Sequence, residues 1–233
     1  MTDLSEKTKG FIFNLDGVIV DTAKYHYIAW RRLADEMGVD FPIEQHEQLR
    51  SLSRMESLEK ILEWGGLYMT EAEKLHWADV KNNWYQALVA NMTPDEVFPG
   101  VLSFLDEVRR SGGKTALSSA SRNARTVLKS THLEPYFDVI LDGSAARKSK
   151  PHPECFLLAA TALNMAPSEC IVFDDAVLGV QAALNGGFHI IGIGKAEYLP
   201  DAERVIPGFA DCHLADILDL VYKGASLTMA DAE

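Results

Sequence analysis

Short apolar segments alternate with stretches of helical periodicity along the C-terminal part of the chain. The apolar segments are too short for helices and are bounded by polar residues or glycine, which is typical of buried strands. This alternation predicts a parallel sheet that is covered by helices on both faces. The expected strands are residues 115–118, 137–141, 170–174 and 189–193. The expected helices around them are residues 101–111, 124–131, 153–164 and 177–185.

The N-terminal part has a different pattern. An apolar strand begins at Phe11, and from Tyr25 to Met37 apolar residues recur at helical spacing until Gly38 ends the helix. Further helices are expected at about residues 55–64 and 71–90, and Thr70 with Glu73 forms a capping box before the second of them. We find no convincing strand between Thr22 and Glu96, so this stretch is interpreted as an all-helical insert.

The length of 233 residues suits a core domain with an insert. We expect an α/β core domain of residues 1–21 and 97–233 and a helical domain of residues 22–96. A composition of 47% hydrophobic and 24% charged residues is that of an ordinary globular protein. The net charge of −12, from 22 basic and 34 acidic residues, argues against nucleic acid and anionic membranes as partners.

The remaining composition favours a cytoplasmic protein. No apolar run approaches the roughly 18 residues of a membrane span, and the N-terminus lacks an apolar targeting segment. The three cysteines, Cys155, Cys170 and Cys212, have no zinc-ligand spacing and are expected to be buried thiols in a reducing compartment.

Polar residues follow several predicted strands, where ligands bind in parallel sheets. The first strand ends in Asn14-Leu15-Asp16-Gly17. Side chains two positions apart lie on the same face of a strand, so Asn14 and Asp16 can point into one crevice, with Asp16 placed to exchange a proton with a substrate hydroxyl. A plain strand and turn is the alternative. The second strand leads into Ser119–Asn123, which is either a phosphate cradle of hydroxyl and N–H groups or a simple helix cap.

Two further loops carry charged residues. Lys150 precedes a helix and is suited to neutralising phosphoryl oxygens, although most surface lysines have no such role. Asp174 and Asp175 end a strand; beside a phosphate they require a cation, and oxygen-only ligands indicate Mg²⁺, whereas a solvated acidic turn is the alternative. The hydroxyl loop, the lysine and the acidic pair, in this order after successive strands, are together far more specific than any one of them.

These motifs give the chain a resemblance to the haloacid dehalogenase (HAD) superfamily over nearly its whole length, and within it to the β-phosphoglucomutase family. The resemblance is carried by residues 16–22, by Tyr25-His26 and Ala29-Trp30, and by residues 49–54, 57–58, 119–123 and 149–151. It implies a HAD-like Rossmannoid α/β core with an inserted all-helical type I cap. It also implies a Mg²⁺-dependent isomerase that interconverts β-D-glucose 1-phosphate and glucose 6-phosphate through an aspartyl-phosphate and β-glucose 1,6-bisphosphate.

The resemblance also implies roles for individual residues. Asn14 lies at the nucleophile position, Asp16 is the general acid/base, and Arg54 holds the distal phosphate. The implied metal ligands are Asn14, the Asp16 carbonyl, Asp174 and Asp175. The implied ligands of the transferring phosphoryl group lie in the loop Ser119, Ala120, Ser121, Arg122 and Asn123 and at Lys150. The residues implied to orient the sugar are His26, Trp30, Arg50, Ser51, Leu52, Ser53, Ser57 and Lys81.

Three positions depart from the family pattern. Asn14 replaces the aspartate that attacks phosphorus, and because an amide is a far weaker nucleophile than a carboxylate, we interpret the chain as a nucleophile-disabled form with impaired activity. Arg50 replaces a lysine and Ser51 replaces a glycine. If that glycine has a positive φ, Ser51 costs about 1 kcal/mol and shifts the substrate loop, which leaves the identity of the sugar open.

The sequence is compatible with two other functions. One is a HAD phosphatase that acts on a small phosphate ester; Arg54 favours the mutase, since a substrate phosphorylated at both ends needs two phosphate sites. The other is a non-catalytic phosphosugar-binding protein, against which the retention of Asp16, Lys150 and the acidic pair argues. We expect a monomer whose partner is a small phosphosugar.

Overall fold

The computed structural model describes residues 9–49, 52 and 54–222. The chain divides into two compact units, one of Met1–Asp21 with Thr93–Glu233 and the other of Thr22–Met92. The second unit therefore ends at Met92, a few residues before the expected boundary at residue 96. Just past the expected boundary, Val97 forms an antiparallel bridge with Val20, and Phe98 N donates to Ile19 O at 2.9 Å.

The first unit, hereafter the core unit, contains a six-stranded sheet in which every pair of neighbouring strands is parallel. The strand order is β3-β2-β1-β4-β5-β6. The strands are β1 (Gly10–Phe13), β2 (Lys114–Ser118), β3 (Val139–Leu141), β4 (Cys170–Asp174), β5 (His189–Ile193) and β6 (Arg204–Ile206). The chain proceeds outward from β1 on one side and then returns to its other side at β4. The loops after β1, β2 and β4 therefore meet where the strand order reverses, which is where such sheets bind ligands.

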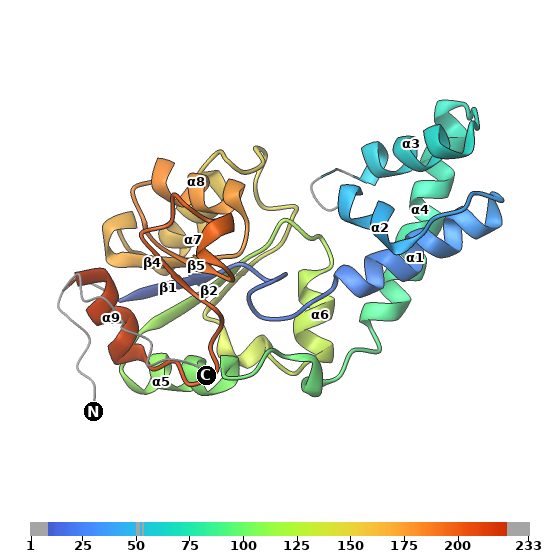
Figure 1. Cartoon of the computed structure of the whole chain (residues 1–233). Coiled ribbons are helices and arrows are strands. Elements are labelled where there is room, and N and C mark those ends of the chain that lie inside the picture. The colour runs from blue at the N-terminus through green and yellow to red at the C-terminus, as the bar shows by residue number, and fades with distance from the viewer. Residues whose placement is uncertain (1–8, 50–51, 53, 223–233) are drawn as a thin grey trace, which may run out of the picture. The chain divides into compact units, whose positions relative to one another are not determined.

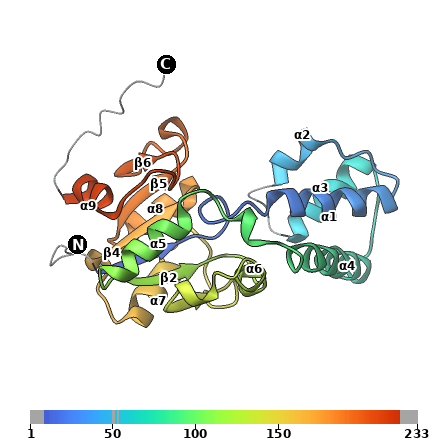
Figure 2. The ribbon, with the colours of Figure 1, turned by 90° about the horizontal axis from the view of Figure 1, so that it is seen from below.

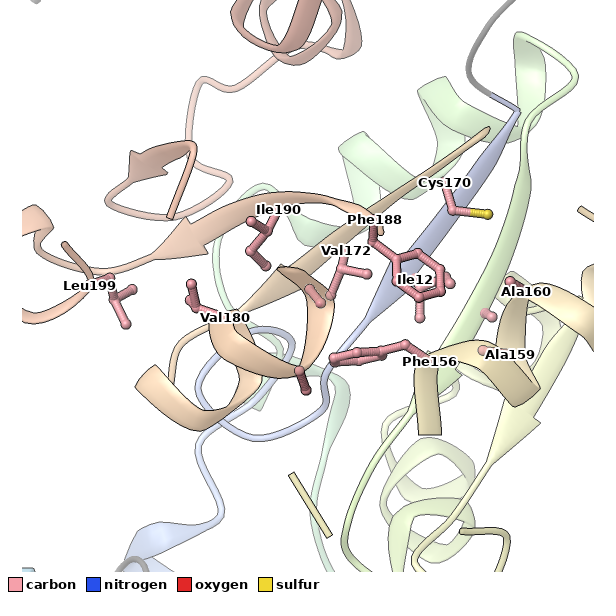
Figure 3. Packing of buried hydrophobic residues seen from close by; sticks show 13 residues of the cluster. Ile12, Phe156, Ala159, Ala160, Cys170, Val172, Val180, Phe188, Ile190 and Leu199 are labelled. Atoms are coloured by element: carbon pink, nitrogen blue, oxygen red, sulfur yellow. The ribbon is translucent and has the colours of Figure 1, made fainter. Parts of the chain in front are cut away.

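One face of the sheet is covered by α7 (Glu154–Leu163) and α8 (Val177–Asn185). Figure 3 shows Phe156 of α7 and Val180 of α8 beside Ile12 and Val172, which project from the two central strands. All four side chains are at most 1% exposed.

The other face carries an aromatic cluster. Phe13 stacks on Phe173 of the neighbouring strand with ring centroids 4.8 Å apart, and Phe104 and Phe209 close over them. Phe104 lies on α5 (Val101–Arg110), which packs against α9 (Leu214–Tyr222); both helices are seen along this part of the sheet in Figure 1. Because both faces are buried, the strands are apolar without alternation, as the sequence pattern indicated.

The second unit, hereafter the helical unit, consists of α1 (Ala23–Glu36), α2 (Ile43–His46), α3 (Arg54–Gly65) and α4 (Glu71–Val89), which are labelled in Figure 2. Its described residues include no strand. Its interior is formed by Leu33, Phe41, Leu58 and Ile61, all fully buried. The capping box at α4 is confirmed: Glu73 Oε2 accepts from Thr70 N at 2.8 Å, and Thr70 Oγ1 accepts from Glu73 N at 3.4 Å.

The α/β fold class and the strands and helices expected from sequence are confirmed, with ends shifted by a few residues. Sequence analysis did not anticipate α2, β6 and α9, and it described α6 (Ala124–Ser130) one residue too long. Single-turn 3₁₀ helices occur at Glu47–Leu49, Pro94–Glu96, Glu134–Tyr136, Pro167–Glu169 and Ala196–Tyr198. In the part of the chain that the structure describes, none of the helices has both the length and the apolar character needed to cross a membrane.

Candidate active site

Asn14 is the centre of a polar cluster at the carboxyl edge of the sheet. Its backbone N–H donates to Phe173 O at 2.9 Å, which continues the pairing of β1 with β4. Its side-chain Nδ2 donates to the carbonyl oxygen of Asp16 at 2.9 Å and to Oδ1 of Asp175 at 3.3 Å. Its Oδ1 accepts from Nζ of Lys150 at 3.4 Å. The structure thus brings together four residues that sequence analysis selected from three separate loops.

Asp174 is the buried acid of this cluster, and no part of it is exposed. Its Oδ2 lies 2.6 Å from Nζ of Lys150, and its Oδ1 accepts from the backbone N–H of Ala176 at 3.0 Å. Burial disfavours the charged amine of Lys150, but the ion pair with Asp174 more than offsets this and raises the pKa of Lys150 above its ordinary value. The lysine therefore remains a cation beside Asn14.

The carboxyl group of Asp175 is partly buried beside a second acidic side chain, that of Asp174. Burial, followed by the neighbouring charge of Asp174, raises the pKa of Asp175 to about 6. Two glycines make room for the acidic pair. A Cβ atom on Gly17, whose φ is +74°, would overlap the Asp175 carboxylate, and one on Gly179 in α8 would overlap that of Asp174. The acids are thus held close to the backbone by residues that cannot be enlarged without displacing them.

The loop between β2 and α6 carries the expected hydroxyl groups. Oγ of Ser119 accepts from the backbone N–H of Ser121 at 3.0 Å, and Oγ of Ser121 accepts from that of Asn123 at 3.2 Å. These contacts support the loop, and each hydroxyl keeps its hydrogen for donation to another acceptor. Ser119 and Asn123 are buried, whereas Ala120 and Arg122 are exposed.

Sequence analysis missed two residues that position these loops. Gly143 N donates to Ser121 O at 3.1 Å, and a side chain at Gly143 would overlap the Ala120 carbonyl. Glu154, the first residue of α7, accepts from the backbone N–H groups of Arg147 and Lys148 at 2.9 and 2.7 Å, and so holds the segment that leads to Lys150. An acidic residue in the first turn of a helix that follows a long loop was the available sequence signal.

The donor set of the cluster fits a hard divalent cation. Mg²⁺ prefers oxygen ligands, and Asn14, the Asp16 carbonyl, Asp174 and Asp175 provide only oxygens besides the amide nitrogen. Among the described residues, no three acidic, histidine or cysteine side chains form a group suited to a metal ion. A magnesium site here would therefore depend on the amide and the carbonyl as well as on the two carboxylates.

The helical unit holds a second set of expected site residues. Lys81 is 3% exposed, and its Nζ is hydrogen-bonded to Nδ1 of His26 at 2.9 Å. The same Nζ lies 4.2 Å from the centre of the Trp30 ring and 5.2 Å from that of Tyr85, on which the His26 ring stacks at 4.0 Å. Tyr85 was not among the residues expected from sequence.

Arg54 is anchored along α4. Its guanidinium donates to Oδ1 of Asn82 at 3.0 Å and lies 3.5 Å from a carboxylate oxygen of Asp79. Its side chain is 36% exposed, so it keeps access to solvent. Ser57 is buried within α3, and Leu52 is 37% exposed. The other expected sugar-binding residues, Arg50, Ser51 and Ser53, lie outside the described residues.

A six-stranded parallel sheet of this order, with a helical insertion after its first strand, defines an α/β protein of the HAD-like fold. A family model of haloacid dehalogenase-like hydrolases matches residues 8–187. The chain belongs to this family, as the resemblance of its motifs predicted.

Comparisons with individual proteins agree with this family assignment. The chain is 36% identical to the "Beta-phosphoglucomutase" of Bacillus subtilis, with 88% of this chain and 92% of that protein covered. It is 30% identical to a "Phosphorylated carbohydrates phosphatase" of Thermotoga maritima, with 79% and 88% covered. The crystal structure of a beta-phosphoglucomutase from Clostridium difficile superimposes with a TM-score of 0.83 at 40% identity, covering 93% of this chain and 98% of that one.

Proposed function

We propose that the chain is a phosphohexose mutase of the β-phosphoglucomutase type, in a form whose nucleophile is disabled. The parent reaction interconverts β-D-glucose 1-phosphate and glucose 6-phosphate through an aspartyl-phosphate at position 14 and a β-glucose 1,6-bisphosphate intermediate. The observation that carries the proposal is the gathering of Lys150, Asp174 and Asp175 around Asn14. We further propose that the protein is a cytoplasmic monomer.

The residues of the core unit are assigned to the transferring phosphoryl group. Lys150 is kept charged by Asp174 and lies beside position 14, so it is suited to neutralising developing negative charge on the phosphoryl oxygens. The free hydroxyl hydrogens of Ser119 and Ser121 are available to the same group. Bound at Asn14, Asp16, Asp174 and Asp175, Mg²⁺ would supply charge neutralisation between the acids and the phosphate. Asp16 would exchange the proton of the sugar hydroxyl.

The residues of the helical unit are assigned to the remainder of the substrate. Arg54 presents a half-exposed guanidinium, which suits bidentate recognition of the distal phosphate. His26, Trp30 and Lys81 form one contact set and are assigned to the sugar, together with Ser57 and the loop that contains Leu52.

Asn14 separates binding from chemistry. Its amide keeps an oxygen for metal or ligand contacts but lacks the charge needed to attack phosphorus. With the lysine, the acidic pair and the hydroxyl loop all present, ligands should bind while transfer is suppressed. Binding without transfer is expected of a disabled mutase, and it is also expected of a protein that only binds phosphosugars.

A phosphatase is the second candidate, because one similar protein bears the name "Phosphorylated carbohydrates phosphatase". A phosphatase transfers the phosphoryl group to water and needs no site for a distal phosphate. Arg54, held by both Asp79 and Asn82 with part of its guanidinium exposed, supports the mutase.

The test is turnover by the Asn14→Asp variant. We expect this variant to be a Mg²⁺-dependent isomerase that requires a bisphosphate primer. The chain as given, with Asn14, should form no aspartyl-phosphate. Adding Asp16→Ala to Asn14→Asp should abolish transfer to the sugar hydroxyl. Mass spectrometry of the Asn14 peptide must exclude deamidation, which would restore a carboxylate. Hydrolysis without isomerisation would establish the phosphatase, and tight phosphosugar binding without either reaction would establish the binding protein.

A further inference from the structure

Lys81 is a buried amine without a carboxylate partner among the described residues. Its contacts are a hydrogen bond to His26 and the faces of the Trp30 and Tyr85 rings. Lys150 differs from Lys81 in this respect: it is also largely buried, but its Nζ lies 2.6 Å from the carboxylate of Asp174. A buried ammonium normally requires such a counter-charge, since aromatic faces compensate only part of its lost hydration.

Among the residues that the structure describes, the groups that face Lys81 are neutral or cationic. His26 on α1 shares a hydrogen bond with it, His46 on α2 lies near His26, and Arg54 on α3 acts on Lys81 through its charge. On α4 itself, Tyr85 faces the amine with its ring, and Asp79 is engaged by Arg54. Burial and then the charge of Arg54 lower the pKa of Lys81 to about 7. Burial, followed by Lys81, His46 and Arg54, lowers the pKa of His26 to about 2, so the His26 ring is neutral.

We propose that Lys81 is a proton acceptor linked to anion binding: in the empty helical unit it is buried against His26 and two aromatic rings, and it takes up a proton when a phosphate group binds at Arg54. The proposal rests on the assignment of the distal phosphate to Arg54. An anion there replaces the repulsion between Arg54 and a protonated Lys81 by attraction. The protonated amine, which can only donate, would keep its bond to His26 with Nδ1 of the neutral ring as the acceptor.

Linkage gives this arrangement a functional consequence. If anion binding favours protonation of Lys81, protonation must favour anion binding to the same extent. The affinity of the helical unit for a phosphosugar should therefore fall by up to about tenfold per pH unit above the pKa of Lys81. Arg54 alone cannot produce such a dependence, because a guanidinium stays charged throughout this range.

The experiment is calorimetric titration of the whole chain with glucose 6-phosphate and Mg²⁺, in buffers of different ionisation enthalpy. At about pH 8 the phosphate monoester is already a dianion, because its second pKa is about 6, so it contributes little to proton uptake. We expect uptake of a large fraction of one proton per ligand. Lys81→Met should abolish this uptake, whereas Lys60→Met, at a half-exposed lysine of the same unit, should leave it unchanged.

The outcomes separate the inference from the proposed function. Absence of glucose 6-phosphate binding in the chain as given would overturn both. Binding without proton uptake, or uptake that persists in a folded Lys81→Met variant, would overturn the inference and leave the proposed function standing.

A second measurement does not require the Lys81→Met variant to fold. Because Nζ of Lys81 lies 4.2 Å from the Trp30 ring, the fluorescence difference between the chain and its Trp30→Phe variant should titrate near neutral pH. Saturating glucose 6-phosphate should move this midpoint to higher pH. A midpoint that the ligand leaves in place would count against the linkage.

Discussion

Nζ of Lys150 lies 2.6 Å from Oδ2 of Asp174, a carboxylate with no exposed surface. The ion pair joins the loop that follows β3 to the end of β4. Since the lysine also reaches Oδ1 of Asn14, the pair fixes a positive charge beside the position from which phosphoryl transfer is proposed to occur. The same geometry makes the pair matter for stability, because removing one partner leaves the other charge buried.

Lys150→Met should lower the free energy of unfolding by about 3–5 kcal/mol, since it leaves Asp174 uncompensated in the interior. Lys60→Met removes a half-exposed lysine that lies 2.8 Å from the exposed Glu63 and should cost less than about 1 kcal/mol. Urea denaturation of both variants tests this difference. Adding Asp174→Leu to Lys150→Met should recover much of the loss. Similar costs for the two lysines would mean that the Asp174 pair is not a buried one.

Gly179→Ala should destabilise the core unit although alanine is the better helix former by about 1 kcal/mol. The added Cβ would overlap the carboxylate of Asp174, which is held by both Lys150 and Ala176. Gly208→Ala is the matched control, because no heavy atom lies within 4 Å of its Cβ position, and its effect should stay within about 0.5 kcal/mol. Thermal unfolding distinguishes them, and a Gly179→Ala protein more stable than the parent would refute the expected clash.

The stability of the protein should depend on pH through Lys81. The pKa of Lys81 is about 7 in the folded state, against 10.5 for an unperturbed lysine, so between these values the unfolded chain binds more protons. The free energy of unfolding should therefore rise with pH across this interval, by up to about 1.4 kcal/mol per pH unit from this residue alone. Below the folded-state pKa, Lys81 is charged in both states and this contribution no longer changes.

Urea denaturation at several pH values in that interval provides the measurement, with Lys81→Met beside the parent chain. The difference in free energy of unfolding between the two should change steadily with pH. If the two curves run parallel, Lys81 retains an ordinary pKa in the folded protein.

The sequence by itself determined the order and type of most elements. The strands could be predicted from the sequence because a parallel sheet buried on both faces requires uninterrupted apolar segments, as in Phe11–Phe13 and Cys170–Phe173. The capping box of Thr70 and Glu73 could be predicted because its contacts join residues that are close in the sequence. The elements that were missed are short or late in the chain, such as β6, whose three residues pair only with β5 at the sheet edge.

The candidate site was only partly determined in this way. The sequence selected Asn14, Lys150 and the acidic pair, because residues after strand ends meet at one edge of a parallel sheet. It could not reveal that Lys150 pairs with Asp174 or that Lys81 contacts His26, which is 55 positions away in the chain. Those relationships depend on which elements become neighbours and how deeply they are buried. Burial removes water from charged groups, and so tertiary structure alone decided that, within the described part of the chain, one buried lysine has a carboxylate partner and the other does not.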